Sequence, residues 1–164
     1  WVSTISMIPK LFNLVLIIFN MVVEKTNDYL SQKFKILPSG HLIINSKVNG
    51  VSAKLIIDTG ASNSCIDINR VEAFKIEIEN YDEQASSATE KIKDMYISTS
   101  NSIDIVGSTI ENSKLFVFDM NHINETLKKN ESTKVDGIIG NDILSKYEGI
   151  ISFREKKIYL KLNL

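Results

Sequence analysis

The chain has 164 residues, of which 43% are hydrophobic and 24% are charged, so it fits one globular domain and is neither disordered nor fibrous in composition. Its 19 basic and 20 acidic residues give no excess of positive charge, which argues against nucleic acid as a partner. A single cysteine, Cys65, excludes an intramolecular disulfide and a cysteine-rich metal site.

Residues 1–33 are predicted to stand apart from the domain that follows, residues 34–164. The apolar run Leu11–Val23 is interrupted by two asparagines and is short for a membrane span. A membrane anchor or signal-like segment, a core helix and a misplaced start codon all stay open as explanations. A start at Met21 would make the protein cytoplasmic, and otherwise it would be membrane-anchored or exported. Residues 24–33 are polar, which predicts a short helix or a linker.

Two β-branched segments, His41–Val48 and Ser52–Ile57, flank an Asn-Gly pair that is typical of a tight β-hairpin. The second strand leads directly into Asp58-Thr-Gly-Ala-Ser62, where a carboxylate is followed by small residues and hydroxyls. Beyond this loop, Asp67–Phe74 has helical spacing with Asp67 as a candidate cap.

The second half of the chain alternates between strand and helix patterns. Residues 75–119 alternate polar and apolar residues between Ser, Asn and Gly turns, which predicts a set of β-hairpins. Met120–Lys129 is predicted to be a helix capped by Asp119 or Asn121. Val135–Leu144 contains Ile-Ile-Gly before a helix start, with a glycine suited to a chain crossing, and two further strand-like segments follow it.

Two of these segments together resemble a known family. Asp58–Ser62 after an apolar strand resembles the active-site loop of the aspartic proteases, and Val135–Leu144 resembles the hydrophobic-hydrophobic-Gly element of their retropepsin-like branch, bacterial single-motif members included. The resemblance implies an all-β fold with two or three short helices. It further implies a closed barrel with one lobe per chain, active as a two-fold homodimer. The expected function is that of an aspartic endopeptidase acting on peptide or protein substrates, and no metal or organic cofactor is implied.

The resemblance also implies a role for each residue of the loop. Asp58 would be the catalytic carboxylate, and two copies of it, one from each subunit, would share a proton and activate a water. Thr59 would help lock the two loops together, and Gly60 would let them approach. Ala61 would line the pocket, and Ser62 could donate a hydrogen bond to the carboxylate.

A flap over the substrate is expected at residues 84–89, with Ser86, Ser87 and Ala88 as its candidate substrate-binding tip. Family flaps are often rich in glycine, whereas this chain has no glycine between residues 60 and 107, so such a tip would be stiffer. That departure favours the alternative function, a catalytically inactive domain for dimerisation or peptide binding. The intact Asp-Thr-Gly-Ala-Ser loop opposes it.

The remaining polar candidates are interpreted as structural. Asp136 and Asp142 are expected to serve turns or caps rather than catalysis. His41 and His122 lie alone on separate elements without metal-ligand spacing, and Cys65 is expected to be a small core residue.

Overall fold

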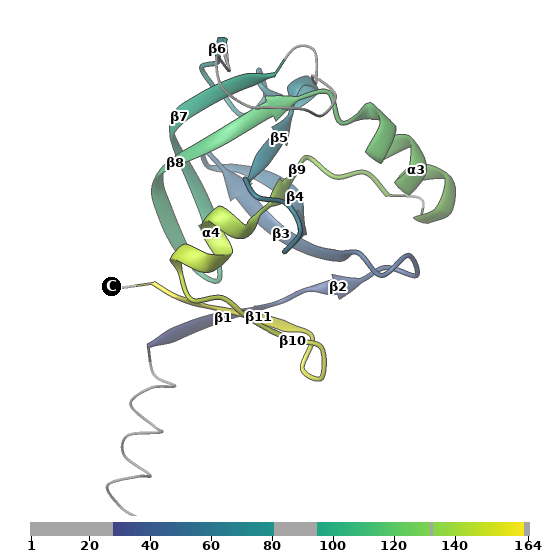
Figure 1. The fold of residues 1–164 in the computed structure, drawn as a ribbon, viewed down its shortest axis with the longest axis vertical. Helices are drawn as coiled ribbons and strands as arrows, with labels where there is room; N and C mark the ends of the chain where they lie inside the picture. The colour runs from purple at the N-terminus through teal and green to yellow at the C-terminus, as the bar shows by residue number, and fades with distance from the viewer. Residues whose placement is uncertain (1–27, 81–94, 132, 163–164) are drawn as a thin grey trace, which may run out of the picture.

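The structure is a computed structural model, which describes residues 28–80, 95–131 and 133–162. Its main feature is a closed barrel of six strands, because β7 pairs with β3 as well as with β8 (Figure 1). In barrel order the strands are β3 (Leu42–Val48), β4 (Val51–Ile57), β9 (Gly137–Ile139), β5 (Cys65–Asp67), β8 (Ser108–Phe118) and β7 (Tyr96–Ile105). The all-β closed barrel predicted from the resemblance is confirmed.

Smaller elements surround the barrel. Short strands β2 (Lys35–Ile36) and β6 (Glu79–Asn80) extend it beside β3 and β7. Below it in Figure 1 lies a three-stranded sheet, with β11 (Lys157–Lys161) between β1 (Tyr29–Lys33) and β10 (Ile150–Ser152). The described residues also form a 3-10 helix, η1 (Ile68–Arg70), and two α-helices, α3 (Asn121–Glu131) and α4 (Asn141–Lys146).

The predicted hairpin at Asn49-Gly50 is confirmed. Both residues have positive φ, 49° and 78°, as a two-residue turn of type I′ between β3 and β4 requires. In the described part of residues 75–119, β6 pairs antiparallel with β7 and β7 pairs antiparallel with β8, in line with the predicted hairpins. The turns suggested near Asn101 are instead register shifts inside the long β7–β8 hairpin. Asn101 and Ser98, which had suggested turns, are both 2% exposed, and the Asn101 amide donates to Ser98 Oγ at 2.9 Å. Polar residues that satisfy each other inside a bulged strand therefore look like turn residues in the sequence.

Two short segments differ from the sequence expectation. Residues 29–33, expected to be a helix or linker, form β1, which pairs antiparallel with β11 from Tyr29↔Lys161 to Lys33↔Lys157. Their partner strand lies at the other end of the chain, so the local sequence carries no sign of it. The helix expected at Asp67–Phe74 is only η1, although Asp67 does cap it by accepting the Asn69 N–H at 3.1 Å.

The core consists of two clusters on the two faces of the sheet. Residues such as Ile44, Leu55 and Ile57 fill the barrel. A second cluster, on the outer face, packs Ile43, Ile56, Cys65 and Ile138 against α3 and its flanks. Among the described residues there is no helix of the length and apolarity that a membrane crossing needs, and the segment 11–23 lies outside them.

Candidate active site

Strand β4 delivers Asp58 to the edge of the barrel. β4 runs parallel to β9 with Ile57 opposite Ile139, and the Asp58 N–H continues this pairing by donating to the Ile139 carbonyl at 3.0 Å. Ile57 is 4% exposed, whereas Asp58 is half-buried. The chain therefore leaves the core at Asp58 with its backbone still fixed to the sheet.

The turn after β4 orients the carboxylate. Asp58 Oδ1 accepts the Gly60 N–H at 2.8 Å, and the Ala61 N–H donates to the Asp58 carbonyl at 3.3 Å. A Cβ at Gly60 would lie 3.3 Å from Asp58 Oδ1, so the glycine leaves room for this oxygen. The site is thus a single carboxylate that is aligned by its own loop and partly exposed to solvent.

The second predicted segment lies directly beneath this loop. A Cβ at Gly140 would lie 2.6 Å from the Asn63 carbonyl carbon and 2.9 Å from the Ala61 carbonyl oxygen. The predicted chain crossing at Gly140 is therefore confirmed. Two amides at the start of α4 also bind the loop, since Asn141 N–H donates to the Ala61 carbonyl at 2.7 Å and Asp142 N–H donates to the Ser62 carbonyl at 3.2 Å.

The hydroxyl that joins the two segments is that of Ser64, two residues after the Asp58–Ser62 loop. Ser64 is fully buried, donates to Asp142 Oδ1 at 2.7 Å and accepts the Gly140 N–H at 2.9 Å. Ser62 is exposed, and the hydrogen bond from its hydroxyl to the carboxylate stays a prediction. Strand alternation accounts for the burial of Ser64, because Ser64 shares its inward face with Ile66.

The other two acidic candidates are held by structural contacts. Asp136 Oδ2 accepts the Lys54 N–H at 2.8 Å, and its Oδ1 lies 2.8 Å from Arg70 Nε, so it joins β4 to η1 rather than closing a turn. Asp142 lies in the first turn of α4, where its charge suits the helix dipole, while Gly140 occupies the cap position. Both carboxylates have partners of their own, and their exclusion from catalysis stays a prediction.

The other predicted residues have the following positions. Thr59 is exposed and borders a hollow of about 220 Å³ with Gly149 and Ile151, between α4 and β10. Cys65 is a core residue as predicted, and burial raises the pKa of its thiol to about 12. His41 and His122 are exposed. The candidate flap residues 86–88 lie outside the described residues, within which no group of His, Cys, Asp and Glu could hold a metal ion.

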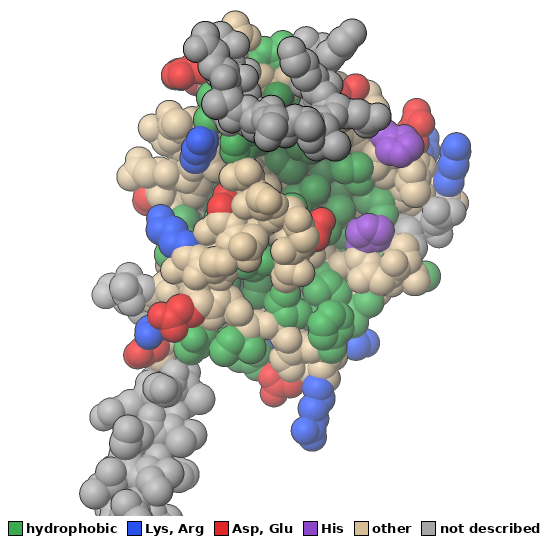
Figure 2. Space-filling view, viewed as in Figure 1, with side chains coloured by type: hydrophobic (Ala, Val, Ile, Leu, Met, Phe, Trp, Pro, Cys, Tyr) green, Lys and Arg blue, Asp and Glu red, His purple; other side chains and the backbone are tan. Residues whose placement is uncertain are grey.

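Beside the loop, the second cluster reaches the surface. Figure 2 shows hydrophobic side chains gathered on the face between β8 and α3, and the partly buried members of the cluster are Ala61, Phe116, Phe118 and Ile123. Ala61 belongs to the Asp58 loop itself. An apolar surface therefore adjoins the carboxylate.

Comparison with known proteins agrees with this geometry. The family model described as aspartyl protease matches residues 44–143, which is more than half of the chain and contains both the Asp58 loop and its crossing at Gly140. The chain belongs to the aspartyl protease family. No curated protein matches it in sequence.

Solved structures of this family have the same fold. A retropepsin-like aspartic protease from Rickettsia conorii has a TM-score of 0.52 at 20% identity, covering 80% of this chain and 90% of its own. The retroviral protease-like domain of Ddi1 from Leishmania major has a TM-score of 0.50 at 15% identity, covering 75% of this chain and 90% of its own. At such identities the likeness establishes the fold.

Proposed function

We propose that the chain is an aspartic endopeptidase in which the Asp58 carboxylates of two identical subunits act together. The observation that carries the proposal is the Asp58 carboxylate, which is aligned by the Gly60 N–H and partly exposed to solvent. Peptide hydrolysis of this type needs two carboxylates that share one proton. Asp136 and Asp142 are already engaged, so the second carboxylate comes from a second copy of Asp58 across a two-fold axis.

The chemistry assigned to this pair is general acid–base catalysis. The ionised Asp58 takes a proton from a water, whose oxygen attacks the carbonyl carbon of the peptide bond. The protonated Asp58 of the partner donates a hydrogen bond to the carbonyl oxygen that gains negative charge. When the tetrahedral intermediate collapses, the first Asp58 gives the proton that it took from the water to the leaving nitrogen, and the carbon–nitrogen bond breaks. The pair ends as it began, with one ionised and one protonated carboxylate, so the reaction needs no further group.

The dimer contact is assigned to the surface that joins Thr59 to β10. β10 is an end strand of its sheet, so one of its edges is open to pairing, and Ile150 on it is 49% exposed. Phe153, just after β10, is 64% exposed. The hollow beside Thr59 lies next to β10, so a partner docked here also brings its own Thr59 loop near the axis.

The substrate is assigned to the apolar surface beside Ala61. An extended peptide laid over it buries aliphatic or aromatic side chains against Phe116 and Phe118 while its scissile bond lies at Asp58. The hydrophobic surface therefore favours substrates with large apolar residues near the cleaved bond.

Cleavage of a peptide library by the full chain tests the proposal. Wild type and two variants, Asp58→Asn and Asp104→Asn, are incubated with the library from acidic to neutral pH, and new termini are mapped by mass spectrometry. Asp104 lies on β7, where it accepts a hydrogen bond from Thr109, and Asn keeps an oxygen for that bond. Cleavage by wild type and Asp104→Asn but not by Asp58→Asn supports the proposal.

Two results would contradict it. Cleavage that survives Asp58→Asn would assign the activity to another group or to a contaminant. No cleavage at any pH by folded, dimeric wild type would leave the alternative, an inactive domain for dimerisation or peptide binding.

A further inference from the structure

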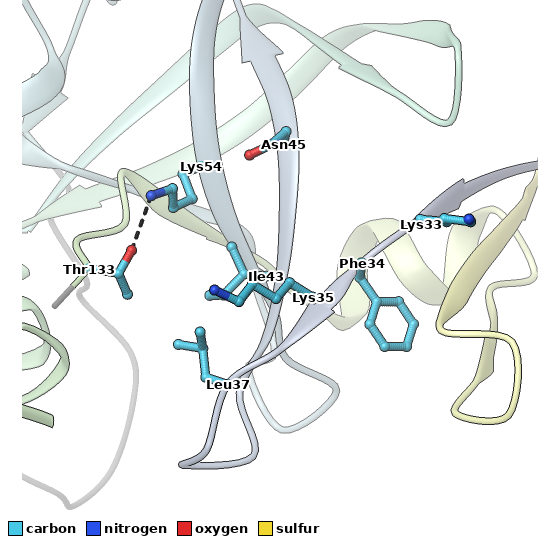
Figure 3. Close-up of a pocket in the computed structure, with 8 residues that line it drawn as sticks. All are labelled: Lys33, Phe34, Lys35, Leu37, Ile43, Asn45, Lys54 and Thr133. Carbon is cyan, nitrogen blue, oxygen red and sulfur yellow. Dashed lines mark hydrogen bonds between the residues drawn. The ribbon is translucent and has the colours of Figure 1, made fainter. Parts of the chain in front are cut away.

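A second cavity opens beside the middle of β4, at Lys54. Its volume is about 330 Å³, within the range of cavities that bind ligands. It is bordered by β2, β3 and β4 and by the segment before β9, as Figure 3 shows. We call it the lysine pocket, because its lining includes Lys33, Lys35 and Lys54 and no acidic residue.

The floor of the lysine pocket is apolar and continuous with the apolar surface at the active site. Leu37 and Ile43, 5% and 6% exposed, line the pocket and belong to the same cluster as Ala61. Along β4, Lys54 and Ile56 project from one face, and Asp58 follows at the next alternate position. The pocket and the carboxylate therefore lie on the same face of the sheet.

Among the residues whose side chains the structure describes, the positive charge in the pocket has no acidic counterpart. Lys54 is half-buried, and its Nζ hydrogen-bonds to the neutral hydroxyl of Thr133 at 3.0 Å. Among the described residues, the ion pairs join Arg70 to Asp136 and Lys161 to Glu148, and neither involves a lysine of this pocket. In Figure 3 the amines of Lys35 and Lys54 lie on the side of Leu37 and Thr133, while Lys33 points away.

A purely structural role explains only part of this arrangement. A lysine on a short end strand such as β2 hinders edge-to-edge aggregation, and this accounts for Lys35. It does not account for Lys54, which lies on β4 between β3 and β9. A carboxylate that hydrogen-bonds to a partly buried ammonium group above an apolar floor stabilises that charge.

We propose that the lysine pocket binds an acidic side chain of the substrate polypeptide, flanked by an aliphatic residue that rests on Leu37 and Ile43. The inference rests on the proposed peptidase function. Lys54 lies four positions before Asp58, which is about 13 Å of extended chain. The acidic residue should therefore lie about four to six residues from the scissile bond.

Direct binding tests this without requiring cleavage. A fluorescent peptide with a Leu-Glu-Leu segment is titrated into the full chain carrying Asp58→Asn, and its polarisation is compared with that of the same peptide with Gln in place of Glu. We expect Lys35→Gln and Lys54→Gln to weaken binding of the acidic peptide by about fivefold each, and high salt to weaken it further. Lys47→Gln, which removes the same charge from β3 at a neighbouring hollow, should leave the affinity unchanged.

Each outcome decides the question. Equal binding of the Glu and Gln peptides, or equal affinity in all lysine variants with unchanged melting temperature, would overturn the inference. Displacement of the peptide by free octanoate at equal concentration would identify a small carboxylate as the occupant and would also overturn it.

A kinetic arm separates this inference from the proposed function. In active protein, Lys35→Gln and Lys54→Gln should raise KM for the acidic substrate with little change in kcat. Binding of the acidic peptide without any cleavage would contradict the proposed peptidase function and leave the lysine pocket in place. Cleavage with an unchanged KM in both variants would defeat the lysine pocket alone.

Discussion

The buried hydroxyl of Ser64 provides the sharpest test of how the active-site loop is held. Ser64→Ala removes the donor to Asp142 Oδ1 and the acceptor of the Gly140 N–H in one step. A hydrogen bond to a charged group contributes about 1.5–3 kcal/mol, and a buried N–H left without a partner costs about 1–3 kcal/mol. Asp142 is half-buried, so water can replace part of the first contact.

We therefore expect Ser64→Ala to lower the free energy of unfolding by about 3 kcal/mol. Urea denaturation measures this as a lower midpoint with an unchanged m-value. Ser62→Ala is the matched control, because its exposed side chain should change stability by less than about 0.5 kcal/mol. A loss below about 1 kcal/mol in Ser64→Ala, or equal losses in the two variants, would refute the assignment of Ser64 as the residue that joins the loop to α4.

Other substitutions test the crossing, the core thiol and the dimer surface. Gly140→Ala places a Cβ against the backbone of the loop, which cannot move aside, so we expect a loss of more than about 3 kcal/mol in the same urea assay, and a stable variant would contradict the crossing. Burial raises the pKa of the Cys65 thiol from 9.0 to about 12, so between pH 9 and 12 the thiol ionises in the unfolded chain and not in the folded one. The free energy of unfolding should therefore fall by up to about 1.4 kcal/mol per pH unit in this range. Cys65→Ala should lack this pH dependence. Ile150→Asp should weaken self-association in analytical ultracentrifugation, while Ile78→Asp, at another exposed isoleucine, should not; equal effects would move the dimer contact elsewhere.

Predictions from the sequence succeeded where the signal was local. The Asn49-Gly50 turn needs two residues that accept positive φ, and this dipeptide supplies them wherever the flanking strands pair. The cap at Asp67 and the crossing at Gly140 could also be predicted locally, because each residue type suits one backbone geometry. The barrel itself came from the resemblance of two segments to a family, and not from strand patterns alone.

Predictions failed where a distant partner decides the structure. β1 looked like a linker because its pairing depends on β11, more than a hundred residues away. The buried Asn101 looked like a turn residue because its partner amide, Asn49, comes from another hairpin, with Asn49 Nδ2 donating to Asn101 Oδ1 at 3.0 Å. The residues next to β1 and to Asn101 do not reveal these distant partners, so local sequence patterns predict the wrong secondary structure there.

The topology explains why two separate motifs identified one site. β9 lies between β4 and β5, parallel to the first and antiparallel to the second, so the chain from β4 to β5 must pass over the end of β9. That passage is the Asp58 loop, and the end of β9 is the segment that reaches Gly140. At the crossing, Gly140 lies so close to the Asp58 loop that it has no room for a side chain. The buried Gly140 N–H needs a polar partner, which the Ser64 hydroxyl after the loop provides. The two motifs are thus opposite sides of one crossing, and the carboxylate owes its fixed position to both.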